Sequence, residues 1–169
     1  MRRTDHYVDM DGSLSTTPNP TTRWGETTYV PKVCAYLTRH DGTQLLVFRG
    51  PDHDDLQVPK GTVEPSEPLD AALRREVAEE SGLVVDHASR LASDVWTRRV
   101  GPLRKYVRHF YHADVDEPRD RWDHVVTGRG GERGETFEFF WIDLPTDEPF
   151  ALSLDDYLPV VRSHAVTGP

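Results

Sequence analysis

The order of apolar and polar residues along the chain predicts several strands and two helices. Strand signals are short runs of alternation, enriched in β-branched and aromatic residues and separated by turn residues. They occur at residues 29–39, 44–49, 56–59, 83–99, 103–115 and 135–144, the fourth of which has room for one strand or two. The first two flank the turn sequence H-D-G-T, which predicts a hairpin. Residues 103–115 alternate most regularly, but neither face is purely apolar, so one face is expected to line a wet cleft.

A helix is predicted between Ser66 and Gly82. Ser66 offers an N-cap oxygen, Pro68 suits a first turn, and Gly82 suits the stop. Good helix formers without an internal breaker lie between them. The apolar stripe of this helix, expected to face the core, consists of Leu69, Ala72, Leu73 and Val77.

A second helix is predicted near the C-terminus, from about Ser153 to Ala165. Asp155 and Asp156 would lie in its first turn, where acidic side chains interact favourably with the helix dipole. Before it, residues 116–134 are polar and rich in Gly, Asp and Arg, which predicts a long loop. This order of elements, with strands before and after the first helix and a helix at the end, predicts an α/β domain with a mixed sheet between two helices.

Three carboxylates share one side of the first predicted helix. Glu76, Glu79 and Glu80 stand at positions i, i+3 and i+4, and they project close to the apolar stripe. Like charges directed toward the body of a domain repel one another and lose hydration, unless cations neutralise them or their pKa values rise. The alternative is a solvated acidic face balanced by arginines, since Arg75 and Glu79 form an i,i+4 pair.

The spacing of the flanking residues favours the cation-binding alternative. The pattern G-x5-E-x7-R-E-V-x-E-E-x-G-L matches the Nudix box at Gly61, Glu67, Arg75, Glu76, Val77, Glu79, Glu80, Gly82 and Leu83. The sequence therefore resembles Nudix hydrolases over these 23 residues, with weaker agreement in the surrounding strands.

This resemblance implies an α/β/α sandwich with a mixed sheet, and a loop–helix–loop that holds Mg²⁺ (or Mn²⁺) against a diphosphate. In the family, glutamates at the positions of Glu76, Glu79 and Glu80 bind or orient the metal ions, and one of them is the base for the attacking water. The backbone carbonyl at the position of Gly61 is often a further ligand. Magnesium requires several oxygen ligands, which it shares with phosphate oxygens and water.

Two other positions of the box have supporting roles in the family. The arginine matching Arg75 holds the carboxylates in place, and the glutamate matching Glu67 helps to orient the loop. Together with the metal ligands, they would support an in-line displacement in which metal ions activate water and stabilise the leaving phosphate.

A further metal ligand is expected after the box, because many relatives supply another glutamate from a later loop or strand. Glu135, six residues before Trp141, is the preferred candidate. Glu132 and Glu138 are the alternatives, and strand alternation places Glu138 on the opposite face from Glu135.

Two cations near the box are candidate substrate-binding residues. Lys60, in V-P-K-G, and Arg49, at the end of a predicted strand, can each meet a phosphate. The combination of P-K-G with E-P-S-E resembles the branch acting on dinucleoside polyphosphates and diphosphoinositols. Signatures of the ADP-ribose, diadenosine polyphosphate and coenzyme A branches are missing. Candidates for stacking on a nucleobase, with core packing as the alternative, are Tyr106, Phe110, Tyr111 and Trp122.

Length, charge and hydropathy argue against a membrane protein and against a nucleic-acid-binding protein. The 169 residues suit a single domain, and the mean hydropathy of −0.63 indicates a soluble protein. No apolar run approaches a membrane span, and no signal-peptide pattern follows Met1. A formal charge of −9 argues against a broad nucleic-acid surface. The lone Cys34 excludes an internal disulfide and is compatible with the cytoplasm.

The first 27 residues are predicted to form a largely irregular arm, followed by a hydrolase domain at residues 28–169. A Ser/Thr/Pro/Asn stretch without periodicity fills the centre of the arm. Such an arm can pack on its own domain or on a partner subunit, which leaves a homodimer open.

The leading functional hypothesis is a magnesium-dependent hydrolase that cleaves a phosphoanhydride bond of a small nucleotide. A nucleoside triphosphate or a dinucleoside polyphosphate is the favoured substrate. One alternative is a non-catalytic nucleotide sensor, but relatives of that kind often lose box carboxylates, which are all present here. Another is an RNA 5′-pyrophosphohydrolase, for which a basic strip is available at Arg98, Arg99, Arg104 and Arg108.

Overall fold

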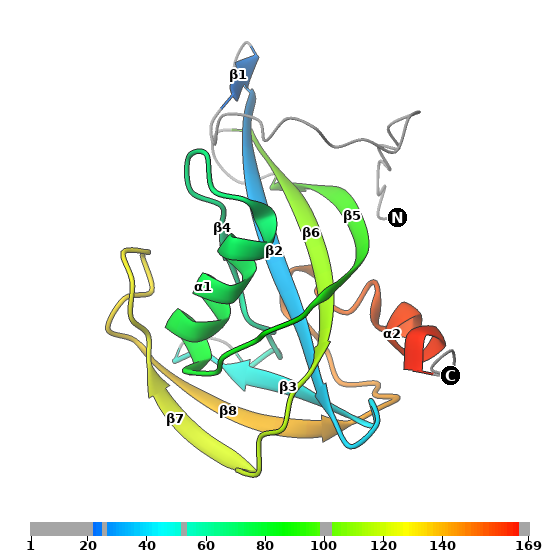
Figure 1. The fold of residues 1–169 in the computed structure, drawn as a ribbon. Helices are drawn as coiled ribbons and strands as arrows, with labels where there is room; N and C mark the ends of the chain where they lie inside the picture. The colour runs from blue at the N-terminus through cyan, green and yellow to red at the C-terminus, as the bar shows by residue number, and fades with distance from the viewer. Residues whose placement is uncertain (1–21, 25–26, 52–53, 99–102, 166–169) are drawn as a thin grey trace.

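A mixed sheet lies between two helices in the computed structural model, which describes residues 22–24, 27–51, 54–98 and 103–165. The strands are β1 (Thr22–Trp24), β2 (Thr27–Arg39), β3 (Gln44–Arg49), β4 (Lys60–Thr62), β5 (Ser89–Arg98), β6 (Arg104–Asp114), β7 (Arg121–Val125) and β8 (Thr136–Asp143). The helical segments are α1 (Leu69–Ser81), the short 3₁₀ helix η1 (Ala151–Ser153) and α2 (Leu158–Ala165). Figure 1 shows α1 and α2 on different sides of the sheet. The predicted α/β architecture is confirmed.

The order of strands in the sheet is β5-β6-β2-β3-β8-β7, with β1 and β4 added beside β2. Only the β2–β6 pairing is parallel among the described strand pairs. β2 and β3 pair only beside their turn, at Thr38–Leu45 and Arg39–Gln44. They then diverge (Figure 1), and β4 pairs with β2 through Lys32, Val33 and Cys34. This divergence places the chain around Gly61 at an open edge, next to α1.

Both faces of the central strands are covered, which explains their nearly continuous apolar sequence. Alternate residues of β2 point to opposite sides: Val33, Ala35 and Leu37 enter the core beneath α1. Cys34 and Tyr36 enter the second core, on the side of α2. The two helices thus cover one layer of sheet from opposite sides, as in a three-layer sandwich.

Helix α1 begins later than its predicted N-cap. Pro68, rather than Ser66, occupies the cap position, without a side-chain cap hydrogen bond. Ser66 has a φ of 61° and therefore lies in a turn before the helix. The predicted stop is correct, because Gly82 ends the helix with a φ of 76°. Most of the predicted stripe is buried: Ala72, Leu73 and Val77.

Two predicted strands are shifted, and one strand was missed. Residues 56–59 form only isolated bridges, and the strand is β4, because the chain meets β2 only after Pro59. In the segment 83–99, a single strand, β5, starts at Ser89. The predicted loop 116–134 contains β7, whose Trp122 is buried and stacks on Phe139 with ring centroids 5.4 Å apart.

The C-terminal helix is shorter than predicted. It starts at Leu158 and not near Ser153, because Leu152 and Ser153 adopt left-handed φ values of 54° and 55°. A start at Leu158 also places Pro159 in the first turn, where its missing N–H breaks no helical hydrogen bond.

Part of the predicted arm is ordered as a strand. β1 pairs antiparallel with β2 at Thr27–Tyr29, so this portion is not irregular. Residues 1–21 and 25–26 lie outside the described residues, as do residues 99–102, part of a predicted turn. No helix in the described chain is long and apolar enough to cross a lipid bilayer.

Candidate functional site

A close approach between β4 and α1 forms the centre of the candidate site. Gly61 lies against Glu76: a Cβ atom at this position would stand 1.8 Å from the Glu76 carboxyl carbon. A larger residue at position 61 would force the Glu76 carboxylate out of this position. The absence of a side chain at Gly61 therefore lets the Glu76 carboxylate lie against β4.

Arg75 ties together three of the predicted acidic residues. Its Nε donates to Glu67 at 2.7 Å, and its Nη1 donates to Glu76 at 2.8 Å. The same Nη1 lies 3.3 Å from a carboxylate oxygen of Glu79. Because Arg75 donates to Glu67, the pKa of Glu67 is lowered. The third Arg75 nitrogen, Nη2, donates to the carbonyl of Thr62 at 3.0 Å, which attaches the array to β4.

Glu80 is buried in the wall of the site. It is 2% exposed and accepts a hydrogen bond from the backbone N–H of Lys60 at 3.0 Å. Burial raises the pKa of Glu80 to about 8, although the nearby Lys60 ammonium opposes this rise. Burial also raises the pKa of Glu76. Both shifts come mainly from the loss of water around the buried carboxylates.

The loop between β7 and β8 covers the C-terminal end of α1. The N–H of Thr127 donates to the carbonyl of Glu79 at 3.0 Å, and the Trp122 indole donates to the carbonyl of Ser81 at 3.0 Å. A Cβ at Gly128 would lie 2.2 Å from a Glu79 carboxylate oxygen. The helix end is thereby capped, and the loop is brought against the carboxylates.

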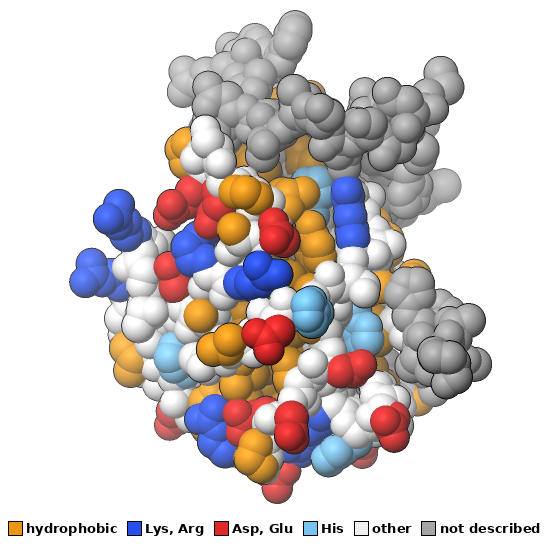
Figure 2. Space-filling view, viewed as in Figure 1, with side chains coloured by type: hydrophobic (Ala, Val, Ile, Leu, Met, Phe, Trp, Pro, Cys, Tyr) orange, Lys and Arg blue, Asp and Glu red, His pale blue; other side chains and the backbone are white. Residues whose placement is uncertain are grey.

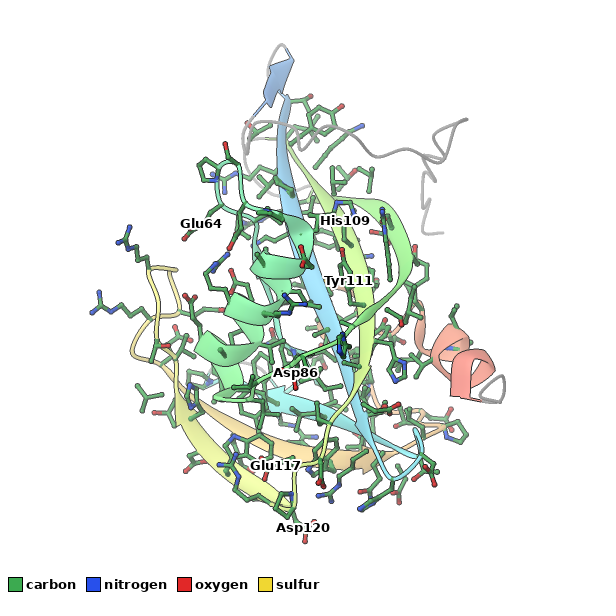
Figure 3. All side chains as sticks on the ribbon, in the orientation of Figure 1. Glu64, Asp86, His109, Tyr111, Glu117 and Asp120 are labelled. Atoms are coloured by element: carbon green, nitrogen blue, oxygen red, sulfur yellow. The ribbon has the colours of Figure 1, made fainter. Side chains whose placement is uncertain are left out.

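These elements enclose a cavity of about 540 Å³, lined by β2, β4, the β4–α1 loop, α1 and the β7–β8 loop. Arg75, Glu76, Glu79 and Glu80 all line it. Figure 3 shows Glu64 in the loop before α1, at the upper edge of this region. Acidic and basic side chains lie side by side over this part of the surface (Figure 2).

Not all predicted site residues meet at this cavity. Lys60 lines it, and its ammonium is buried, without a hydrogen-bond partner in the described part of the chain, 4.0 Å from Glu132. Arg49 is not among the lining residues; it donates to the carbonyl of Asp54 and lies 3.9 Å from Glu148. Glu135 is not in the lining either, whereas its alternative Glu132 is.

The candidate stacking residues differ in their exposure to solvent. Phe110, Tyr111 and Trp122 are buried at 0%, 7% and 8% exposure, so they act as packing residues. Tyr106 is partly exposed. Within the predicted basic strip, Arg108 is buried in an ion pair with Asp94 and is therefore not available at the surface. Arg99 lies outside the described residues.

Comparison with known families decides the classification. The Nudix domain model matches residues 28–153, most of the chain. The chain belongs to the Nudix family. Among curated proteins, none matches its sequence significantly.

Solved Nudix structures have the same fold. A MutT protein from Methanosarcina mazei has a TM-score of 0.57 at 18% identity, covering 88% of this chain and 99% of that one. A MutT Nudix hydrolase from Burkholderia pseudomallei has a TM-score of 0.55 at 23% identity, covering 79% and 98%. The Nudix domain of NrtR from Shewanella oneidensis, solved with ADP-ribose, has a TM-score of 0.57 at 17% identity, covering 79% and 86%.

The Nudix box residues present here fit a hard divalent cation. Across the described ranges, no three His, Cys, Asp or Glu side chains already converge as a metal-binding group. Instead, the Arg75 guanidinium lies between Glu76 and Glu79, at 2.8 and 3.3 Å. The donors around the cavity are carboxylate and backbone oxygens, which Mg²⁺ and Mn²⁺ prefer. A cation beside Glu76 and Glu80 would favour their ionised form, which burial disfavours.

The sequence analysis did not identify one contributor to the Nudix site and ranked another only as an alternative. Gly128 approaches Glu79, but no motif distinguished it from the neighbouring glycines. Glu132, predicted only as an alternative to Glu135, reaches the cavity through the turn between β7 and β8. The alternation R-W-D-H-V in β7 was the available signal for this hairpin.

Proposed function

We propose that this Nudix protein is a divalent-metal-dependent hydrolase that cleaves a phosphoanhydride bond in a nucleoside diphosphate derivative. The observation that carries the proposal is the arrangement of Glu76, Glu79 and Glu80 around one cavity, with Gly61 packed against Glu76. A nucleoside triphosphate or a dinucleoside polyphosphate is the favoured substrate. The NrtR Nudix domain solved with ADP-ribose supports a small nucleotide ligand for this fold.

In this proposal, Mg²⁺ (or Mn²⁺) is held by Glu76, Glu79, Glu80 and the carbonyl of Gly61, with Glu132 in the role expected of Glu135. The metal supplies charge stabilisation for the phosphate oxygens and an acidified water. Glu132 replaces Glu135 because only Glu132 lines the cavity.

The protein's own groups position the reaction. Arg75 and Glu67 hold the carboxylates in place through their hydrogen bonds. Glu76 is the proposed acceptor for the proton of the attacking water, because it lies in the cavity, fixed between Arg75 and Gly61. Lys60 contributes positive charge at the cavity wall. Arg49 has no role in this proposal, because it contacts Asp54 and Glu148 and does not line the cavity.

A substrate panel tests the proposal directly. Nucleoside triphosphates, dinucleoside polyphosphates and nucleotide sugars are incubated with Mg²⁺ or Mn²⁺, and phosphate release is measured after phosphatase coupling. We expect turnover of at least one class, and nearly complete loss of turnover in Glu80→Gln with an unchanged fold. Glu138→Gln is the matched control, because Glu138 pairs with Arg121 and is not part of the cavity lining. Equal turnover by wild type and Glu80→Gln would contradict the proposed roles.

The same panel separates the alternatives. Tight nucleotide binding without product after long incubation would indicate a sensor. Strongly salt-dependent binding of triphosphorylated RNA would indicate an RNA 5′-pyrophosphohydrolase. The burial of Arg108 weakens the basic strip on which that alternative depends. A cytoplasmic location, compatible with the buried free thiol of Cys34, is part of the proposal, and a homodimer remains a prediction.

A further inference from the structure

A pair of aromatic rings lies outside both hydrophobic cores and close to the cavity. Trp96 of β5 and Tyr106 of β6 are directly paired across the strands, with ring centroids 5.9 Å apart. Both side chains are partly exposed, and neither belongs to the core cluster under α1 or to the one under α2. Large aromatic rings that are left out of a core are available for a ligand.

Strand alternation places this pair on the sheet face opposite α1. His109 and Tyr111 of β6 lie on the face covered by α1 (Figure 3), so Tyr106 faces the other way. Val30 of β2 is the cross-strand neighbour of Tyr106 and also lines the cavity. The aromatic pair therefore continues one wall of the cavity along the sheet.

A chain of contacts connects the aromatic pair to the carboxylates. The Lys32 ammonium lies 5.6 Å from the centre of the Tyr106 ring and donates to the Thr62 hydroxyl at 2.7 Å. The Thr62 carbonyl accepts from Arg75, which in turn contacts Glu76. Lys32 and Thr62 both line the cavity. A cation thus stands between the acidic centre and the aromatic rings.

The charge around Tyr106 is suited to an anionic ligand. Arg98 and Arg104 are paired with each other two residues from the aromatic pair, and the Lys32 ammonium lies over the Tyr106 ring. These cations lower the pKa of Tyr106, outweighing the burial that would raise it. The order of these groups matches that of a nucleotide. The carboxylates would lie at the anhydride, the lysine at the remaining phosphate and the aromatic rings at the base.

We propose that Trp96 and Tyr106 form the subsite for the nucleobase, and that Lys32 binds the phosphate that stays on the nucleoside. This inference rests on the proposed function for the location of the anhydride. Base stacking on aromatic side chains depends little on base identity, so the subsite would accept several nucleotides unless other groups select among them. The ligand class is a nucleoside mono- or diphosphate unit within the substrate.

Tryptophan fluorescence tests the subsite without requiring hydrolysis. Wild type, Trp96→Phe and Trp141→Phe are titrated with adenosine, guanosine and uridine monophosphates in the presence of EDTA. Trp141 is the matched control because its indole donates to the Arg119 carbonyl and its ring packs on Arg39, away from the cavity lining. We expect at least one nucleotide to quench wild type and Trp141→Phe, and the quenching to be lost in Trp96→Phe. Inorganic phosphate alone should not quench.

Variants of Tyr106 separate stacking from a structural role. Tyr106→Leu should raise the nucleotide Kd, and the KM for a hydrolysed substrate, at least tenfold with kcat little changed. Tyr106→Phe keeps the ring and should restore affinity to within about threefold of wild type. Thermal unfolding of each variant checks the fold.

The outcomes distinguish this inference from the proposed function. Quenching that persists in Trp96→Phe, no quenching of wild type at millimolar nucleotide, or an unchanged Kd in Tyr106→Leu would each overturn the subsite. A wild-type protein that binds nucleotides through Trp96 but hydrolyses none would overturn the proposed function and leave the subsite standing. Turnover with an unaltered KM in Tyr106→Leu would overturn the subsite and leave the proposed function standing.

Discussion

Replacing Gly61 by alanine should displace Glu76 and impair catalysis without unfolding the protein. The added Cβ would stand 1.8 Å from the Glu76 carboxyl carbon, whereas ordinary contact begins at 3.4 Å. The carboxylate must therefore move by about 1.6 Å, the difference between these distances. Gly61 is not among the described glycines with positive φ, so alanine adds no backbone strain there.

The size of the effect follows from the cost of misplacing a catalytic group. A displacement of about 1 Å can reduce a rate about 100-fold, which corresponds to about 2.7 kcal/mol of activation free energy. We expect kcat of Gly61→Ala to fall by about this factor or more. The assay is steady-state turnover of the best substrate from the panel, with thermal unfolding to verify the fold.

A glycine in the same cavity provides the control. Gly131 also lines the cavity, but a Cβ there would meet no atom within 4 Å, and its φ is not positive. Gly131→Ala should keep wild-type kcat. The reasoning would be refuted if a folded Gly61→Ala retained wild-type kcat, because the position of Glu76 would then not matter for turnover.

Three further predictions concern the loop and the cores. Gly128→Ala should lower kcat more than Gly134→Ala, since both have φ near 85° but only Gly128 approaches a carboxylate of α1; equal kcat values would contradict this. Asp94→Ala leaves the buried Arg108 guanidinium without its main partner and should cost about 3–5 kcal/mol in urea unfolding; a loss below about 1 kcal/mol would disagree. Burial lowers the pKa of His109 to about 4. The neutral imidazole should therefore make its full contribution to the free energy of unfolding above about pH 6.5, and this free energy should fall by up to about 3 kcal/mol toward pH 4. His109→Gln should flatten this decline, and an unchanged pH profile would count against it.

Local patterns in the sequence were sufficient to predict helix α1 and the family to which its acidic residues belong. The stripe of Ala72, Leu73 and Val77 and the stop at Gly82 follow from helical periodicity and backbone preference, and both are present in the structure. The spacing of the box acids identified the family because it encodes a loop and a helix that are contiguous in the chain. Contacts within about twenty residues of sequence are the ones that such a pattern can specify.

Contacts between distant segments were not accessible in the same way. The choice between Glu132 and Glu135 depends on the β7–β8 hairpin, and the segment holding β7 was interpreted as a loop. The burial of the Lys60 ammonium depends on the pairing of β4 with β2, a strand distant in the sequence. Arg49 was placed near the site only by its position in the chain, but its guanidinium contacts Glu148 instead.

The most direct test of the account is the calorimetric titration of Mn²⁺ into the substrate-free protein. Wild type and Glu138→Gln should bind the ion with equal affinity, and Glu79→Gln should bind it at least tenfold more weakly. The same affinity in all three proteins, or no detectable binding by wild type at millimolar Mn²⁺, would contradict the claim that the carboxylates of α1 hold a divalent cation.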